Sequence, residues 1–265
     1  HDPPDRDDMA HGIAGRMARY AYRIGAQFFN PLRWPRVPEE IVEYASDLRA
    51  FRRMRGARSV PLDLEPVFFN RRIRSPFDAH YTYQAAWATR LIAGRAPTAH
   101  VDVSSAVPFV AQLAAIVPVT MYEFSAPDIA LAGLTVREAT VVSLPMADRS
   151  VDSLSCLHVI EHVGLGRYGD PLDPDGMDKA TRELCRVLAP GGALYVSFPV
   201  GRERVAFNAH RVTDADAFVA RVAAEGVALR GFALIDDAGR FHDPARPEDA
   251  RGLAYGCGCF WFGRD

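Results

Sequence analysis

The stretch from 151 to 170 constrains the fold most strongly, because a buried strand there leads directly into a run of polar side chains. Residues 151–159 form an apolar run, which is typical of a strand buried on both faces of a parallel sheet. His158, Glu161 and His162 follow, and a glycine-containing loop comes next. Ligands of open α/β sheets bind beyond the carboxyl ends of the strands, so these side chains are candidates for a functional site.

Short apolar runs and helical patterns alternate after Pro97. This alternation predicts an α/β fold with a doubly wound, mostly parallel sheet. We expect strands at 99–103, 117–124, 134–139, 151–159, 193–198, 229–235 and 254–262, with helices at 107–116, 177–188 and 214–224.

The first part of the chain has a different pattern, which we interpret as a helical N-terminal extension. Residues 9–29 contain no proline, and a second helix begins at Pro38 with acidic residues in its first turn. A third helix is expected at 78–93, before Gly94 and Pro97. The predicted domains are therefore a helical extension at 1–95 and an α/β core at 96–265.

Composition limits the partners. The formal net charge of −2 gives no electrostatic reason to expect nucleic acid or an anionic membrane surface. No apolar stretch approaches the ~20 residues that a membrane span needs. We expect a cytoplasmic protein with a small-molecule substrate, and a homodimer remains an open alternative.

The cysteines indicate no disulfide framework, because a chain of this length carries only four. Cys257-Gly-Cys259 could be a metal or redox pair. Metal motifs normally need two such pairs, so we interpret these cysteines as small buried residues of a terminal strand.

Three segments resemble class I S-adenosylmethionine-dependent methyltransferases. They are 144–152 (LPMADRSVD), 158–163 (HVIEHV) and 183–192 (ELCRVLAPGG), in the order and spacing of that superfamily. The resemblance implies a seven-stranded, Rossmann-like sheet and S-adenosylmethionine as cofactor.

A closer resemblance is to a family of unknown function that shares this core. It covers about residues 75–263 and implies the same sheet, but no established reaction. The residues that carry it are His80-Tyr81, Gln84, Trp87, His100-Val101-Asp102, 164–170 (GLGRYGD) and 207–211 (FNAHR).

The methyltransferase resemblance also implies cofactor-binding residues. Glu123 would hold the ribose hydroxyls, Asp102 and Ser104 would border the methionine end, and Thr140 takes the position of an adenine-binding Asp. His158 completes the predicted set. The chain departs from the superfamily at 102–106, because this turn has no glycine where the backbone normally approaches the cofactor.

A metal site is one interpretation of the central motif. His158, Glu161 and His162 share a face if the chain is helical there. His-x-x-Glu-His is also the inverzincin motif, but that motif lies inside a long helix. Small-RNA terminal 2′-O-methyltransferases are similar at this place and bind a divalent ion, which adds His210 as a fourth ligand. Three imidazoles and a carboxylate favour Zn²⁺, Mn²⁺, Fe²⁺ or Ni²⁺ over Mg²⁺. In the other interpretation, Glu161-His162 only caps the strand and His158 lies in the core.

The predicted catalytic residues are His210, Glu161 and Arg211. The ordinary pKa of histidine, about 6.5, suits a general base that takes the proton of a hydroxyl group. Arg211 and Arg167 could pair with a carboxylate or phosphate of the substrate; alternatively, Arg167 caps carbonyls of its own loop.

The leading functional hypothesis is a methyltransferase that uses S-adenosylmethionine on an oxygen nucleophile of a small-molecule or saccharide-like acceptor, with or without metal assistance. The first alternative is a metal-dependent enzyme on the same fold that no longer uses S-adenosylmethionine. The second is a non-catalytic, degenerate methyltransferase that serves as a partner protein.

Overall fold

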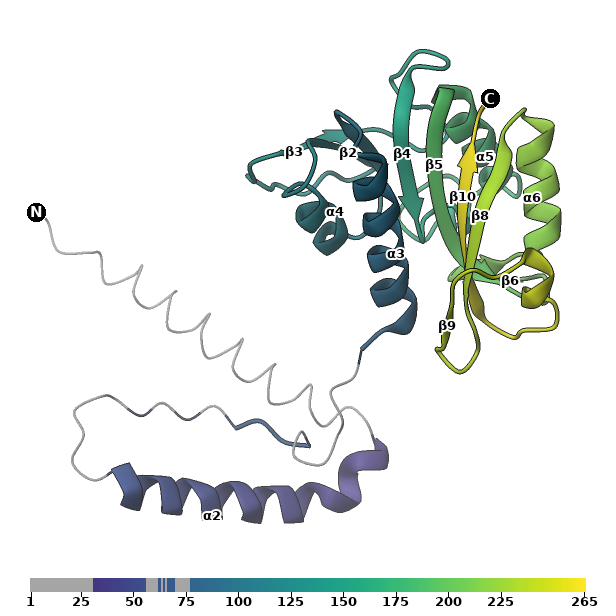
Figure 1. Cartoon of the computed structure of the whole chain (residues 1–265). Helices are drawn as coiled ribbons and strands as arrows, with labels where there is room; N and C mark the ends of the chain where they lie inside the picture. Colours follow the sequence, from purple (N-terminus) through teal and green to yellow (C-terminus); the bar gives the residue numbers. More distant parts are fainter. Residues whose placement is uncertain (1–30, 56–61, 63, 65, 70–76) are drawn as a thin grey trace, which may run out of the picture. The chain divides into compact units, whose positions relative to one another are not determined.

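The computed structural model describes residues 31–55, 62, 64, 66–69 and 77–265 (Figure 1). The helix predicted at 9–29 lies outside the described residues. The chain divides into two compact units, residues 1–76 and 77–265. This division comes earlier than the predicted boundary after residue 95, because α3 (Ala79–Arg95) packs with the strands that follow it.

The described part of the first unit contains a 3₁₀ segment (Pro31–Arg36) and the long helix α2 (Val37–Arg55). Glu39 and Glu40 lie in the first turn of α2, where carboxylates complement the helix dipole. Glu40 is buried and accepts a hydrogen bond from the backbone N–H of Phe69 at 2.8 Å.

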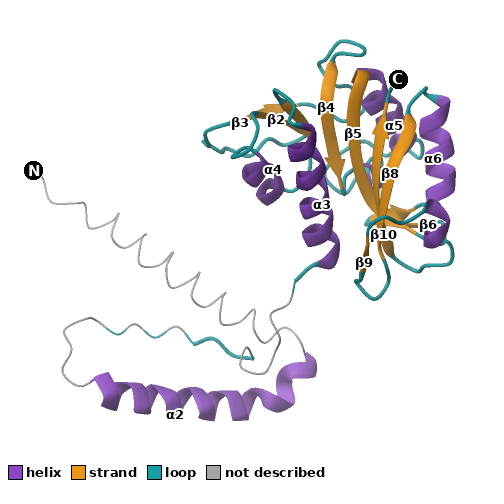
Figure 2. Cartoon of the chain, in the orientation of Figure 1, coloured by secondary structure: helices purple, strands orange, loops and turns teal. Residues whose placement is uncertain are grey.

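An eight-stranded sheet forms the second unit, in the order β3-β2-β1-β4-β5-β10-β8-β9 (Figure 2). Neighbours from β3 to β5 are parallel, and β10 is antiparallel to both β5 and β8. The α/β, doubly wound and mostly parallel sheet predicted from the sequence is therefore confirmed. The strands are β1 (His100–Val103), β2 (Val119–Glu123), β3 (Leu134–Glu138), β4 (Val151–Leu157), β5 (Leu188–Val200), β8 (Ala228–Ile235), β9 (Phe241–His242) and β10 (Gly256–Gly263).

The sequence did not predict β9, the eighth strand of this sheet, nor the separate two-stranded sheet of β6 (Arg204–Ala206) and β7 (His210–Val212). β9 has two residues and pairs antiparallel with the end of β8. Such a short strand shows no alternation of apolar and polar residues. Without β9, seven strands remain, as predicted.

Two layers of helices cover the sheet. Alternate residues of β5 belong to different cores: Leu194, Val196 and Phe198 pack in the core that includes α5 (Gly176–Val187) and α6 (Ala215–Ala224). Ala193 and Tyr195 pack in the core that includes α3 and α4 (Val107–Leu113). This follows from the pleat of the strand, in which successive side chains point to opposite faces.

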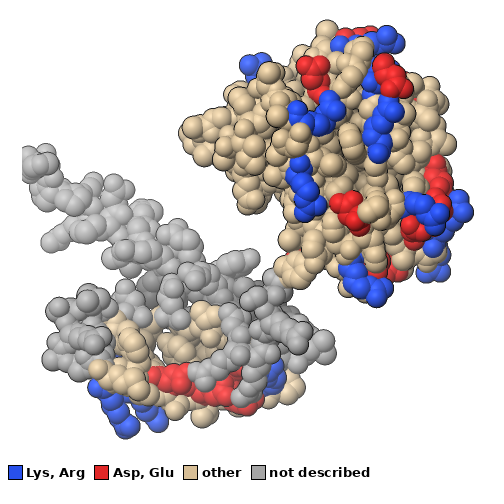
Figure 3. Space-filling view, viewed as in Figure 1, with Lys and Arg blue, Asp and Glu red and all other residues tan. Residues whose placement is uncertain are grey.

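The exposed face of the second unit in Figure 3 carries Lys and Arg side chains interspersed with Asp and Glu side chains. Charges of the two signs also pair on this unit, as between Arg186 and Asp148 at 2.6 Å and between Lys179 and Asp173 at 2.6 Å. Within the described residues, no helix is both long and apolar enough to cross a membrane.

Candidate active site

A cavity of about 330 Å³ opens where β1, β2 and β4 end, as expected for an open α/β sheet. Its volume lies in the range of ~300–1,000 Å³ that is usual for small-molecule sites. Apolar side chains such as Phe124 and Val141 form much of its wall, and Glu123 adds a carboxylate. We refer to this space as the apolar cavity.

Most of the predicted cofactor-binding residues line the apolar cavity. The structure places Ser104, Glu123, Thr140 and His158 on its wall. Oε1 of Glu123 accepts hydrogen bonds from the N–H of Phe124 at 2.8 Å and from the Ser104 hydroxyl at 3.2 Å. These bonds orient the carboxylate at the end of β2, where the sequence predicted a ribose-binding group.

The turn after β1 shows how the chain manages without the expected glycine. Ser104 has a φ of 56°, in the left-handed region that favours glycine. For other L-residues this conformation costs about 1–2 kcal/mol. The Ser104 hydroxyl contacts Glu123 and the carbonyl of Tyr122, at 3.2 and 3.3 Å, and these contacts hold the turn in place.

Asp102 is not part of the cavity wall, contrary to its predicted role beside the cofactor. It is fully buried, and its Oδ1 accepts the N–H of Ser105 at 3.0 Å. Its Oδ2 accepts the hydroxyl of Ser155, the residue opposite it on β4. Ser155 also contacts Nε2 of His100 at 2.8 Å. Asp102 therefore belongs to a polar network inside the sheet that fixes the turn carrying Ser104.

The Asp102 network makes a testable contribution to stability. Burial raises the pKa of Asp102 to about 6, above its ordinary value of about 3.9. The folded state then binds more protons than the unfolded state between these two values, so stability falls as the pH rises from about 4 to about 6. We expect Asp102→Asn to remove about 2–3 kcal/mol of this pH dependence.

Urea unfolding at pH 4.5, 6 and 8 measures the effect of Asp102→Asn. Asp152→Asn, at an exposed position on β4, is the matched control and should keep the wild-type dependence. An unchanged pH profile in Asp102→Asn would exclude this carboxyl group as the source.

A second cavity, of about 500 Å³, adjoins the first and is more polar. His158 and His162 line both cavities. The other walls include His80 and Tyr81 from the start of α3, Arg167, Tyr255, and His210 at the start of β7 (His210–Val212). We call this space the polar cavity.

Glu161, predicted to be catalytic, lines neither cavity: it is fully buried behind two imidazoles that line both. Its Oε1 is 2.7 Å from Nδ1 of His158 and 3.6 Å from Nε2 of His162. Its Oε2 is buried and has no hydrogen-bond partner among the described residues. Nδ1 of His162 is 2.6 Å from the carbonyl oxygen of Ala209, so this nitrogen carries the proton and donates.

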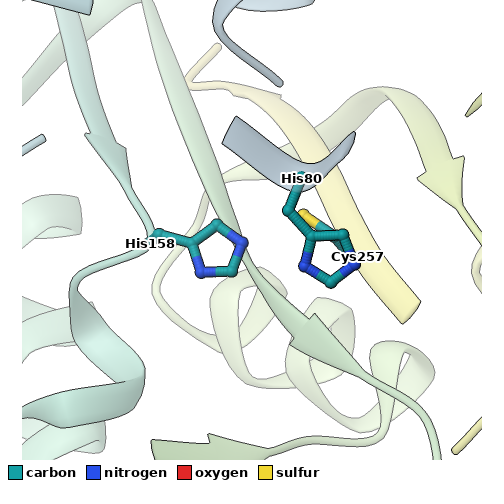
Figure 4. A group of neighbouring side chains, drawn as sticks. All are labelled: His80, His158 and Cys257. Carbon is teal, nitrogen blue, oxygen red and sulfur yellow. The ribbon is translucent and has the colours of Figure 1, made fainter. Parts of the chain in front are cut away.

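The four predicted metal ligands do not form one compact group. Glu161 bridges His158 and His162, and His210 reaches the polar cavity from another strand. The ligand atoms that lie within 4.8 Å of one another belong instead to His80, His158 and Cys257 (Figure 4). The sequence interpretation treated Cys257 as a plain buried residue, and it used His80 only as a mark of family resemblance.

Arg211 does not face the cavities, although it was predicted to be catalytic. Its Nη1 donates to the carbonyl of Val163 at 2.6 Å, and its Nη2 donates to the carbonyls of Asp173 and Pro174, both at 3.3 Å. Arg211 thus holds the loop after Glu161 in place. Arg167 lines the polar cavity, as a substrate-binding residue would, and donates to the carbonyl of Ala209 at 2.9 Å; this carbonyl lies outside the loop that Arg167 was alternatively predicted to cap.

His210 has the environment of a proton acceptor. Burial lowers its pKa, and the neighbouring His162 lowers it further. Its ring packs against Tyr255, with centroids 5.0 Å apart. Burial lowers the pKa of His80 to about 4, so this imidazole is neutral at pH 7.

The strand order and the antiparallel β10 define the fold, which is the class I methyltransferase fold that the sequence resemblance implied. A family model described as a Caenorhabditis protein of unknown function, DUF268, matches residues 141–235. The sequence matches no curated protein.

Solved structures are similar to this chain at low sequence identity. The crystal structure of the 4+2 cyclase SpnF is 18% identical, with a TM-score of 0.50 over 71% of this chain and 85% of that chain. A protein from Bacillus halodurans is 13% identical, with a TM-score of 0.49 over 67% of this chain and 97% of that chain. The N-methyltransferase NodS from Bradyrhizobium japonicum, solved with S-adenosyl-L-homocysteine, is 14% identical, with a TM-score of 0.47 over 68% and 85%.

Proposed function

We propose that this protein is an S-adenosylmethionine-dependent methyltransferase that acts on an oxygen nucleophile of a small-molecule or saccharide-like acceptor. The observation that carries the proposal is the pair of adjoining cavities with His158 and His162 in both walls. One cavity is apolar and has a carboxylate at the end of β2, and the other is polar and rich in imidazoles. Such a pair suits a cofactor and an acceptor that meet at the shared wall.

The apolar cavity fits the cofactor by the chemistry of its wall. S-adenosylmethionine supplies an electrophilic methyl group on a sulfonium ion. Glu123 accepts hydrogen bonds, as needed to hold ribose hydroxyls, and Oε2 of Glu123 keeps no partner among the described residues. Phe124 and Val141 form an apolar wall against which the adenine ring of the cofactor can pack. The turn at Ser104 lies beside Glu123 and borders the rest of the cavity.

The polar cavity fits a hydroxylated acceptor. Tyr81, Tyr255 and the imidazole of His80 supply ring faces, and Arg167 supplies donors. His210 accepts the proton of the attacking hydroxyl, because its lowered pKa keeps the ring neutral near pH 7. Holding the nucleophile in line with the methyl group supplies much of the rate by orientation.

A transfer assay tests the proposal. The full chain is incubated with methyl-labelled S-adenosylmethionine and three sets of acceptors: polyols and saccharides, amines, and thiols. The expected result is label in a product that carries a methyl ether. Label only in amines or thiols would contradict the oxygen acceptor, and S-adenosylmethionine that binds but is never consumed would contradict the transfer.

One observation favours a second function, a metal-dependent enzyme that no longer uses S-adenosylmethionine. The turn at 104–106 carries side chains where the superfamily brings bare backbone close to the cofactor, and Ser104 holds its left-handed conformation at a cost. A binding measurement with S-adenosylmethionine separates the two functions, because only the methyltransferase binds this cofactor.

A further inference from the structure

Three potential metal ligands come together from distant parts of the chain. His80 lies in the first turn of α3, His158 follows β4, and Cys257 is the second residue of β10. Their ligand atoms all lie within 4.8 Å of one another, and Figure 4 shows the two imidazoles with the sulfur of Cys257 next to His80. Tetrahedral zinc sites place N and S ligands about 3.5 Å apart, so the group must contract around an ion. The two imidazoles stack with centroids 5.4 Å apart and planes at 28°, so they must also turn until one nitrogen of each points at the ion.

The two ring nitrogens of His158 have different surroundings, in the pattern that is usual for a histidine that binds a metal. Its side chain is only 5% exposed, yet Nε2 is buried with no partner among the described residues. Its other nitrogen, Nδ1, is 2.7 Å from Oε1 of Glu161. Histidines that bind metals almost always donate their second ring N–H to a carboxylate, carbonyl or water. A buried donor or acceptor without a partner costs about 1–3 kcal/mol, which a metal bond would offset.

Charge gives a second argument. The Glu161 side chain is fully buried, and within the described residues its carboxylate pairs only with the imidazoles of His158 and His162. Arg211 approaches the residue, but it donates to the backbone carbonyl of Glu161 at 3.4 Å and not to the carboxylate. A divalent ion bound to a thiolate beside this carboxylate gives a neutral cluster, and buried charges require such compensation.

We propose that His80, His158 and Cys257 bind one Zn²⁺ ion, with Glu161 as the carboxylate that orients His158. The N and S donors suit zinc, whereas Mg²⁺ and Ca²⁺ prefer oxygen ligands. Three protein ligands leave a fourth position open, as in catalytic zinc sites. His80 and His158 also line the polar cavity, so an ion that they bind lies at the wall of the space that the proposed function assigns to the acceptor. There the ion binds an oxygen ligand and lowers its pKa.

Metal analysis of the purified full chain tests the proposal without any assay of activity. The wild type is dialysed against a chelator, reloaded with ZnCl₂ alone, and analysed by mass spectrometry for zinc per chain. We expect one zinc ion per chain in the wild type and its loss in Cys257→Ser. Glu161→Gln should weaken zinc binding by about 10–100-fold, the usual effect of losing a carboxylate behind a ligating histidine.

Cys259→Ser is the matched control, because this cysteine is equally buried on the same strand but lies outside the ligand group. It should retain one zinc ion per chain. A thermal melt verifies that each variant folds, and His80→Asn gives the same test at a half-buried position if Cys257→Ser does not fold. Replacement of zinc by Co²⁺ adds a readout, since sulfur-to-cobalt charge-transfer absorption should appear in the wild type and vanish in Cys257→Ser.

Two results would overturn the zinc site. The first is the absence of bound metal after reloading of a folded wild type. The second is unchanged zinc content in both Cys257→Ser and His80→Asn. If these two variants keep their zinc and His210→Ala loses it, the ion binds at the four ligands predicted from the sequence and not at Cys257. Neither result bears on S-adenosylmethionine binding, which is measured separately.

Discussion

Replacing Gly164 by alanine is expected to destabilise the second unit by about 3–5 kcal/mol, more than the ~1–2 kcal/mol that a left-handed conformation alone costs. Gly164 has a φ of 80°, and a Cβ at this position would lie 2.0 Å from the carbonyl oxygen of Asp173. The backbone cannot move away easily. The N–H of Gly164 donates to Asp170 at 2.6 Å, and its carbonyl accepts the N–H of Asp173 at 2.9 Å.

Gly169→Ala separates the steric contact from the backbone conformation. Gly169 has a φ of 84° in the same loop, but a Cβ there would meet nothing within 4 Å. This control should lose only the ~1–2 kcal/mol of the left-handed conformation. Urea unfolding of both variants gives the two free energies, and equal losses would show that the contact with Asp173 is relieved at little cost.

The second large effect is expected at His210. His210→Asn should lower kcat for methyl transfer by about 10²–10⁴-fold, the usual contribution of a general base. Asparagine can still form hydrogen bonds in the polar cavity, but it cannot take up the proton. KM for S-adenosylmethionine should change little, because His210 lines the polar cavity and not the apolar one.

The pH dependence gives a second readout for His210. Burial and the neighbouring His162 lower the pKa of His210 below 6.5, so the neutral ring already dominates at pH 7. Wild-type kcat should therefore rise with pH below 6.5 and level off near neutrality, and this rise should vanish in His210→Asn, which has no ionisable group at this position. His242→Asn is the control, since His242 lies on β9 and pairs with Asp236 at 3.0 Å. If His210→Asn keeps the wild-type kcat, His210 is not the general base.

The sequence predicted the sheet well because its signals are local. The strand predicted at 151–159 corresponds to β4, and the helix predicted at 177–188 corresponds to α5. Each boundary depends on residues within a few positions of it. The division of the chain was harder to predict. The sequence of α3 indicates a helix but not its partner, and only its packing against the sheet assigns it to the second unit.

The site was predicted in part, for the same reason. Glu123 and His158 lie in the last residues of the strands predicted at 117–124 and 151–159, so topology places them at the carboxyl end of the sheet. The pairing of His80 with Cys257 depends on a contact between the first turn of α3 and the start of β10, which no local pattern reveals. Arg211 has the spacing of a substrate-facing residue, but its carbonyl partners lie far away in sequence.

Calorimetric titration of the folded full chain with S-adenosylmethionine measures directly whether the chain binds this cofactor. We expect saturable binding of one molecule per chain, weakened at least about tenfold in Glu123→Gln, because one hydrogen bond to a charged group contributes about 1.5–3 kcal/mol. Glu138→Gln is the matched control, since Glu138 pairs with Glu123 in register but is exposed on β3, and it should bind as the wild type does. No heat at millimolar ligand, or equal affinity in wild type and Glu123→Gln, would contradict the account.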